Sequence, residues 1–268
     1  MSRVDEYLAR IGVERPERLD LDALATLQRA HLAAVPFENI DVYDRVPVTV
    51  EQDAILAKII DRDRGGWCFE ANGGFAWLLE ALGFSVRRLG AAVLLDGPNK
   101  AIDHLALEVQ LDRPYLVDVG FGDSFTQPLD LSRGKPQPGG KADFQLLPSP
   151  QGTTLAEIED GLPAAKYRFK RVAHDLDEFG PVSQRLYDDG DAHWQRWPFA
   201  TRLLGEAGSL GETGAHLADR VTLLADRLKI RRGSHTTETP VAAADWDDVL
   251  FEWFGMRRTR GGSAATRR

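Results

Sequence analysis

Cysteine, long apolar runs and clustered histidines are all scarce in this sequence, and each scarcity excludes a class of protein. Cys68 is the one cysteine among 268 residues, so an internal disulfide cannot form and a reducing compartment is expected. The six histidines are scattered and neither CxxC nor HExxH occurs, so no metal site is expected. No segment approaches the ~18 consecutive apolar residues of a membrane span, and the N-terminus lacks the apolar run of a secretory signal. We therefore expect a cytoplasmic protein with no membrane partner.

Positive charge is also in deficit, because 33 Lys and Arg stand against 41 Asp and Glu, for a net charge of −8. A nucleic-acid partner is not expected, since binding to the phosphate backbone needs a basic surface. Residues 257–268 hold five arginines and no acid, which leaves −13 on the rest of the chain. We expect this basic tail to be disordered. With 43 % hydrophobic residues, the remainder can bury a real core.

The spacing of apolar residues predicts helices in the first third of the chain and strands in the middle. Helices are expected over 21–35, 51–63, 68–83 and 245–256. Strands are expected over 85–95, 103–111, 114–121, 143–147 and 166–173. Residues 216–232 fit either a helix or a pair of strands.

Two glycines lead into Cys68 within RGGWCFEANGGFAWLLEALGF (64–84), at the start of a predicted helix. A glycine pair allows a sharp turn or a close approach to a ligand, and a helix N-terminus offers free N–H groups and a positive dipole end. Both stabilise a thiolate and, later, an oxyanion. The alternative is an inert, buried cysteine, the commonest state of a free thiol.

A cysteine nucleophile needs a base and a group that orients the base, and His104 and Asp118 are the best candidates. Asp118 interrupts an otherwise apolar strand, where it either orients an imidazole or is a satisfied structural group. A tight hairpin turning at 112–113 would place the two side chains on opposite faces of the sheet. A bulge, a three-residue loop or a different connection is required to bring them together.

Four segments together resemble the arylamine N-acetyltransferases in order and spacing: VPFENID (35–41), RGGWCFEANG (64–73), DHLALEV (103–109) and YLVDVGFG (115–122). The resemblance covers roughly residues 5–130. It implies a papain-like α+β fold with a catalytic triad of Cys68, His104 and Asp118. The implied parts are an N-terminal helical bundle (1–84), a central β-barrel (85–190), a C-terminal α/β lid (191–256) and the tail (257–268).

The resemblance also implies transfer of an acetyl group from acetyl-CoA to Cys68, and then to the nitrogen of an arylamine or arylhydrazine. This ping-pong reaction uses acetyl-CoA as co-substrate and needs neither a bound cofactor nor a metal. The chain departs from the family in its second half, where residues 185–204 lack the usual Thr-Ser-Thr-His-Pro-like block. That departure is compatible with a related branch of amide synthases, which take a polyketide acyl chain from an acyl carrier protein. A thiol hydrolase, or a relative that only binds an aromatic ligand, is a third hypothesis.

Six further positions match residues with known roles in the family. Arg64 and Glu38 correspond to a pair that braces the catalytic loop, and an ordinary surface charge is the alternative for each. Phe37 and Phe121 correspond to aromatics that line the acceptor pocket, although core packing is the commoner role of such residues. Gly122 corresponds to a glycine beside the thioester, and Phe199 to the phenylalanine that follows the missing block.

Overall fold

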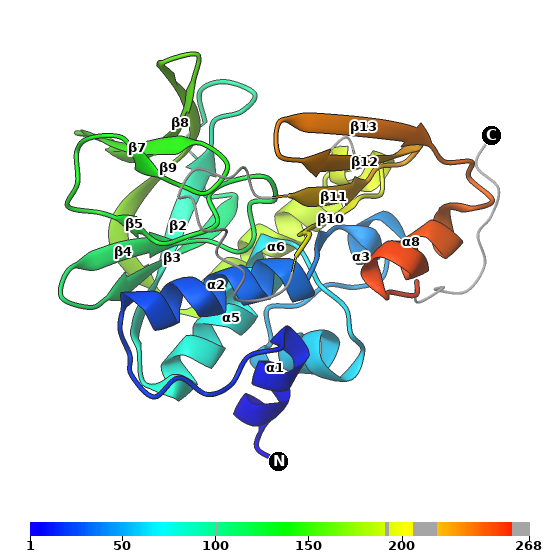
Figure 1. The fold of residues 1–268 in the computed structure, drawn as a ribbon, viewed down its shortest axis with the longest axis horizontal. Coiled ribbons are helices and arrows are strands. Elements are labelled where there is room, and N and C mark those ends of the chain that lie inside the picture. Colours follow the sequence, from blue (N-terminus) through cyan, green and yellow to red (C-terminus); the bar gives the residue numbers. More distant parts are fainter. Residues whose placement is uncertain (100, 191–192, 206–218, 259–268) are drawn as a thin grey trace.

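The computed structural model describes residues 1–99, 101–190, 193–205 and 219–258, and the expected basic tail therefore lies almost wholly outside the described residues. The N-terminal third is helical, as expected (Figure 1). Its elements are α1 (Arg3–Ile11), α2 (Leu21–Ala34), α3 (Ile40–Tyr43), α4 (Gln52–Leu56), η1 (Ala57–Asp61) and α5 (Cys68–Leu82), with the two-residue strand β1 (Phe37–Glu38) between α2 and α3.

Helix α2 begins after Asp20, whose side chain accepts a hydrogen bond from the Ala23 N–H, and α5 ends at Gly83 in the left-handed region. The single helix expected over 51–63 is instead a short α-helix that continues as the π-helical turn η1. Lys58 lies in this turn and is buried. The wider turn accompanies an inward-pointing lysine, which a sequence-based helix prediction does not anticipate.

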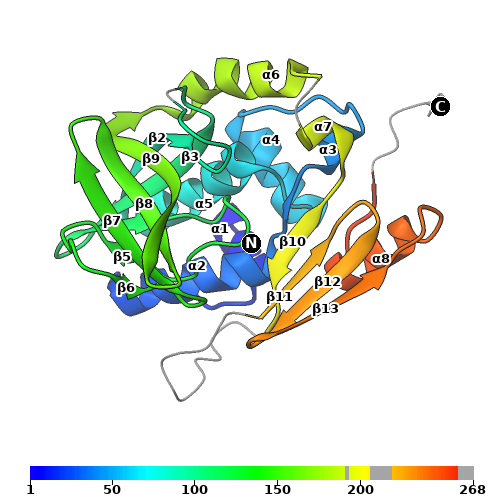
Figure 2. The ribbon, with the colours of Figure 1, turned by 90° about the horizontal axis from the view of Figure 1, so that it is seen from above.

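An eight-stranded antiparallel sheet curls into a near-closed barrel beside these helices (Figures 1 and 2). In spatial order its strands are β5 (Leu129–Asp130), β4 (Pro114–Val117), β3 (His104–Gln110), β2 (Ser85–Val93), β9 (Leu162–His174), β8 (Gly152–Glu159), β7 (Asp143–Ser149) and β6 (Gln137–Pro138). The Gln137 side chain bonds both backbone groups of Asp130, so one amide links the two edge strands.

The hairpin between β3 and β4 has a three-residue loop, 111–113, because Gln110 pairs with Pro114 and Leu107 with Val117. This register differs by one residue from that of a tight turn at 112–113. Since side chains alternate across a strand, the extra loop residue brings His104 and Asp118 to the same face. The three-residue loop is one of the solutions that the sequence left open.

A second, five-stranded antiparallel sheet follows in the chain and takes β1 as its first strand. Its other strands are β10 (Ala200–Leu203), β11 (Arg220–Leu223), β12 (Arg227–Arg232) and β13 (His235–Pro240). The ambiguous segment 216–232 is therefore two strands in its described part. Helix α8 (Trp246–Phe254) covers this sheet, and α6 (Gly180–Asp188) and α7 (His193–Arg196), preceded by η2 (Leu176–Phe179), connect it to the barrel (Figure 2). The α+β fold class is confirmed, while the exact domain boundaries stay a prediction.

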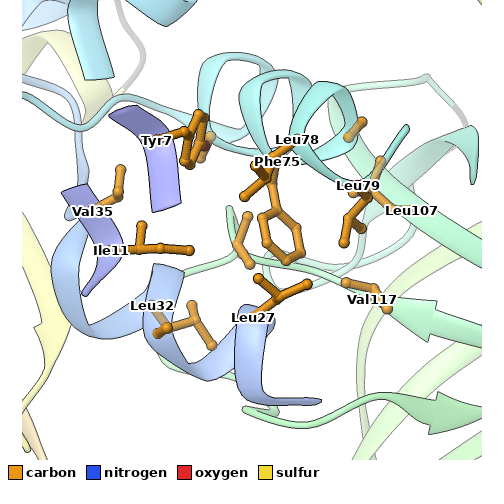
Figure 3. Close-up of a cluster of buried hydrophobic side chains, with 14 of the residues drawn as sticks. Tyr7, Ile11, Leu27, Leu32, Val35, Phe75, Leu78, Leu79, Leu107 and Val117 are labelled. Carbon is orange, nitrogen blue, oxygen red and sulfur yellow. The ribbon is translucent and has the colours of Figure 1, made fainter. Parts of the chain in front are cut away.

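The main core lies between α1, α2, α5 and the strands β3 and β4 (Figure 3). Phe75 of α5 is fully buried at its centre, where its ring lies 5.0 Å from that of His31. Leu107 and Val117 of the two strands close the same cluster. Because α5 packs on β3 through this core, apolar packing helps to hold the helix N-terminus against the strand that begins at His104.

No helix among the described residues is long and apolar enough to cross a membrane.

We expect Phe75→Ala to lower the free energy of unfolding by about 3–5 kcal/mol, because it leaves a cavity in close-packed surroundings. Phe251→Ala is the matched control, since Phe251 is 46 % exposed on α8, and it should cost less than about 1 kcal/mol. Urea denaturation followed by circular dichroism measures both. Equal losses in the two variants would contradict the placement of the core.

Candidate active site

Cys68 is the first residue of α5, and its side chain lies in an apolar cluster with Phe37, Trp67 and Leu105. Only 8 % of the residue is exposed. The positive end of the helix dipole and the free N–H groups of the first turn are therefore close to the sulfur. The helix N-terminus favours negative charge beside the sulfur, and the apolar cluster around it limits contact with water.

The glycines before Cys68 allow two backbone segments to lie very close together. The Gly66 N–H donates to the Pro36 carbonyl, and the Glu38 N–H donates to the Gly66 carbonyl. A Cβ at Gly65 would stand 1.7 Å from the Pro36 oxygen, so no other residue fits there. The glycine pair thus serves the packing of the segment before Cys68 on residues 36–38, and that packing fixes the start of α5.

His104 and Asp118 form a buried pair, with His104 Nε2 2.7 Å from Asp118 Oδ2. His104 begins β3, and Asp118 follows the last residue of β4. The other carboxylate oxygen, Oδ1, accepts hydrogen bonds from the Asn72 side chain at 2.9 Å and from the Gly120 N–H at 2.8 Å. Three hydrogen bonds therefore hold the Asp118 carboxylate in one orientation, and the carboxylate in turn orients the imidazole.

Asn72 connects the helix that carries Cys68 to the strands that carry the pair. Its Nδ2 also donates to the Leu105 carbonyl at 2.6 Å, and its Oδ1 accepts from the Val119 N–H at 3.0 Å. Asn72 stands four residues after Cys68, on the same face of α5. Sequence analysis did not single out this residue, although the i, i+4 spacing within the motif was a usable signal.

The charge state of His104 is set by two opposing effects. Burial by itself lowers the pKa of His104, but the charge of Asp118 and its hydrogen bond, together with those of the Cys68 side chain, outweigh it. The pKa rises from 6.5 to about 10. His104 is therefore an imidazolium at neutral pH, placed between a carboxylate and the cysteine.

Two aromatic rings enclose the imidazole. Phe121 lies edge-on at 5.1 Å between ring centroids, and Tyr167 of β9 lies at 5.0 Å. Burial and the nearby Asp118 charge raise the pKa of Tyr167, which therefore stays neutral. These rings keep His104 in a low-dielectric setting, in which its contact with Asp118 is strengthened. Tyr167 was not foreseen from the sequence because its strand is distant from the motifs.

Gly120 lies directly against the cysteine. A Cβ at this position would be 2.7 Å from the Cys68 Cα and 2.7 Å from Asn72 Nδ2. The strand end that carries Asp118 can therefore approach α5 only because residue 120 has no side chain.

Behind the cysteine lies a network of five buried charges, which includes the expected partners Arg64 and Glu38. Arg64 Nη2 contacts Glu38 Oε1 at 2.7 Å and Asp41 Oδ1 at 2.9 Å. Lys58 Nζ contacts Asp41 at 2.8 Å and Glu70 of α5 at 2.8 Å. The network joins the segment before α5 to its first turn. In the sequence, Lys58 is recognisable only as a single lysine within the apolar run AILAKII.

The remaining candidate residues gather on the side of Cys68 that faces the second sheet. The Phe37 ring lies 5.3 Å from that of Phe199 and 6.5 Å from that of Trp194. Gly122 adopts φ = +84°, and a Cβ there would stand 3.3 Å from the Phe37 ring. The Asn39 amide binds the carbonyls of Trp194 and Trp197 and the N–H of Phe199, so one side chain holds the 194–199 segment over Phe37.

The site contains no alternative set of metal ligands: among the described residues, no three His, Cys, Asp or Glu side chains are grouped so that they could hold an ion.

We expect Gly120→Ala to slow alkylation of Cys68 by iodoacetamide at least several-fold, because the added methyl group must push the cysteine or Asn72 out of place. Gly134→Ala is the matched control, since no atom lies within 4 Å of a Cβ at that exposed position. Mass spectrometry of the alkylated protein gives both rates. An unchanged rate in Gly120→Ala would contradict the described contact.

The raised pKa of His104 predicts a titration midpoint near pH 10 in the folded protein. The stabilisation from its charge is fully present below pH 6.5, the ordinary value, and is lost as pH rises toward about 10. NMR of the histidine side chains measures the midpoint directly. Asp118→Asn should move it down by more than one unit, since it removes the largest raising effect. A midpoint near 6.5 in the unmodified protein would show that the ion pair does not form.

Comparison with known proteins shows which family this chain resembles along its length. Residues 20–260 match a family described as N-acetyltransferase. An arylamine N-acetyltransferase of Mycolicibacterium smegmatis is 40 % identical over 159 residues, which are 56 % of this chain and 58 % of that protein. The pineal gland isozyme NAT-3 of Gallus gallus, also an arylamine N-acetyltransferase, is 40 % identical over 191 residues, 69 % of this chain and 65 % of its own. The chain thus aligns with less than two thirds of either relative's length.

A solved structure extends the similarity to nearly the whole chain. The arylamine N-acetyltransferase of Mycobacterium marinum, determined in complex with CoA, has a TM-score of 0.84 and 30 % identity, and the match covers 94 % of this chain and 92 % of that one. The two folds therefore agree over nearly the whole chain. Because the family match covers most of the sequence and the fold agrees along it, the chain belongs to the arylamine N-acetyltransferase family.

Proposed function

We propose that the protein transfers an acetyl group from acetyl-CoA to the nitrogen of an arylamine or arylhydrazine, with Cys68, His104 and Asp118 as its catalytic residues. The observation that carries the proposal is the placement of Cys68 at the start of α5 beside the 2.7 Å His104–Asp118 pair. Membership of the family supports the reaction class, and the CoA complex of the Mycobacterium marinum relative supports the donor.

In the first half-reaction, the Cys68 thiolate attacks the acetyl carbonyl carbon, and the C–S bond to CoA breaks. His104, as imidazolium, gives its proton to the departing CoA sulfur, and an acetyl-Cys68 thioester remains. The N–H groups at the start of α5 are placed to hold the negative charge that develops on the carbonyl oxygen. Asp118 keeps the imidazole ring oriented throughout.

In the second half-reaction, the amine nitrogen attacks the thioester carbon, and the bond to Cys68 Sγ breaks. His104 accepts the proton that the amine loses, so the thiolate–imidazolium pair is restored. Water competes with the amine for the same carbon. The apolar neighbours of Cys68 disfavour water, and aromatic amines enter such surroundings more readily than aliphatic ammonium ions do.

We assign the acceptor side of the site to Phe37, Phe121, Gly122 and Phe199. Phe121 contacts the His104 ring, and Phe37 contacts both Gly122 and Phe199. Flat rings stacked among these side chains would present their nitrogen to the thioester. Arg64 and Glu38 act one layer further away, as supports of the segment before Cys68.

Intact-mass spectrometry with acetyl-CoA and no amine tests the proposal. We expect the protein to gain the mass of one acetyl group and to lose it when an arylamine is added. Cys68→Ala should gain nothing, and Asp118→Asn should react at least about 100-fold more slowly, because the imidazole loses its orientation and its charge.

Three results would count against the proposal. If the protein gains mass only from longer acyl thioesters and not from acetyl-CoA, the result would favour an amide synthase that takes its acyl group from a carrier protein. Rapid loss of the acetyl group without an amine would favour a hydrolase. If Cys68→Ala gained the same mass as the unmodified protein, the nucleophile would be another residue.

A further inference from the structure

Gln28 is a fully buried amide in the middle of α2 that the proposed mechanism does not use. Its Nε2 donates a hydrogen bond at 3.3 Å to the main-chain carbonyl of Asp118, 90 positions further along the chain. The preceding residues, Leu27 and Val117, belong to one apolar cluster (Figure 3), so α2 meets the end of β4 at this point. Helix α2 therefore reaches the residue that orients His104.

The carbonyl that Gln28 binds is one end of the peptide group that joins Asp118 to Val119. The pairing of β4 with β3 ends at Val117, one residue earlier, so the strand ladder does not extend to this peptide group. The other end of the group, the Val119 N–H, donates to Asn72 Oδ1 at 3.0 Å. A trans peptide is planar, and its N–H and C=O point in opposite directions. Asn72 of α5 and Gln28 of α2 therefore hold one peptide plane from opposite sides.

This peptide plane determines how the side chain of Asp118 leaves the backbone. A rotation of the plane changes the dihedral angle ψ of Asp118, one of the two soft dihedrals of that residue. The carboxylate would then move relative to the imidazole, which its Oδ2 contacts at 2.7 Å from His104 Nε2. A hydrogen bond weakens as its distance and angle depart from the ideal. The two amides thus act on the contact between Asp118 and His104 through the backbone.

The amide of Gln28 is costly to keep in the core. Its Oε1 atom is buried and has no hydrogen-bond partner among the described residues, and a buried polar atom without a partner is destabilising. The reverse orientation of the amide would place two oxygens against each other, so only the Nε2 donor can face the carbonyl. A methionine would occupy nearly the same volume without an unsatisfied oxygen. A packing role alone therefore does not account for this residue.

His31, three residues later on α2, is also fully buried and provides a contrast. Its Nδ1 lies 3.2 Å from the Tyr7 hydroxyl of α1, and its ring lies 5.0 Å from that of Phe75. Burial and the charge of Arg10 lower the pKa of His31 to about 3, so the ring is neutral. These contacts lie within the main core, whereas the hydrogen bond of Gln28 leads out of it to the site.

We propose that Gln28 is a positioning residue for the reaction, which orients the Asp118 carboxylate by holding the Asp118 carbonyl opposite Asn72. The inference rests on the proposed function for the roles of Asp118 and His104. The effect of Gln28 passes through Asp118, because its one hydrogen bond among the described residues goes to that carbonyl. Without this bond the peptide plane is held on one side only, and the carboxylate supports the imidazolium less well.

The experiment measures the titration midpoint of His104 by NMR of the histidine side chains, in the unmodified protein, Gln28→Met and Leu24→Ala. Burial lowers the pKa of His104, and Asp118 supplies the largest effect that raises it, so the midpoint reports on the placement of Asp118. Gln28→Met keeps the length of the side chain and removes the donor. Leu24→Ala is the matched control, since Leu24 is fully buried one turn earlier on α2 and its side chain has no polar atom.

We expect Gln28→Met to lower the His104 midpoint by at least about half a unit, because a less ordered carboxylate favours the charged imidazole less. Leu24→Ala should weaken the protein against urea through the cavity it leaves, yet keep the His104 midpoint in place. With acetyl-CoA, Gln28→Met should form acetyl-Cys68 about tenfold more slowly at saturating donor, while the donor concentration that gives half the maximal rate stays the same.

An unchanged His104 midpoint in Gln28→Met would overturn the inference, and so would an unchanged rate of acetyl-Cys68 formation. An equal shift of the midpoint in Leu24→Ala would overturn it as well, because the shift would then reflect a general loss of packing. If Gln28→Met does not fold, Gln28→Asn replaces it: the amide stays buried but is one methylene too short to reach the carbonyl, and the same shift is expected.

The NMR measurement requires no acyl transfer. Failure of the unmodified protein to form acetyl-Cys68 would count against the proposed function, whereas the His104 midpoint judges the role of Gln28 separately.

Discussion

Docking of α5 onto the ends of β3 and β4 is the constraint on which the candidate site depends. Cys68 comes from the helix, whereas His104 and Asp118 come from the barrel, so the relative placement of two structural layers decides whether they meet. Phe75 and its neighbours supply the apolar packing, and Asn72 fixes the register through bonds to Leu105, Asp118 and Val119. Apolar contacts are tolerant of small shifts, whereas three hydrogen bonds from one amide are not.

The buried charges behind Cys68 serve the same placement at an energetic cost. Lys58 and Arg64, with Glu38, Asp41 and Glu70, are almost fully removed from water. Desolvation of such groups can exceed their mutual attraction, so the network is weak evidence for stability. Its geometry is more informative, because it links η1, β1 and the first turn of α5 by directional contacts. The segment that presents the thiol is thereby held in one conformation.

Much of the fold and of the site could be predicted, because the signals were local. The helix that begins at Cys68 and the strands around His104 and Asp118 follow from apolar periodicity and from the glycines at 65 and 66. The strand β8 was missed, since its polar and apolar residues alternate only weakly, and Lys58 was included in an ordinary predicted helix. Asn72, Gly120 and Tyr167 act through contacts between distant segments. Such contacts depend on tertiary packing, which no local pattern encodes.

The relation of His104 to Asp118 shows the limit of prediction most clearly. The length of one loop decides whether the two side chains lie on the same face of the sheet. A loop that is one residue shorter would place them on opposite faces. The sequence LDR at 111–113 contains no glycine or asparagine to indicate the turn type. The alternation of side chains could state that a three-residue loop would bring His104 and Asp118 together. The pairing of Gln110 with Pro114 shows that the loop has this length.

The membership of β1 in the second sheet has a consequence for how the protein assembles. Phe37 pairs with Thr201, and Asn39 binds Phe199 across 160 positions of the chain. Contacts of such long sequence separation form late, because the entropy of closing a large loop must be offset first. During synthesis, the helices and the barrel can therefore pack before the aromatic surroundings of the thiol exist. A partly made chain would hold Cys68 near His104 with the Phe37 side still open to water, so the Cys68 thiol is most exposed to oxidation before the last sheet has been added.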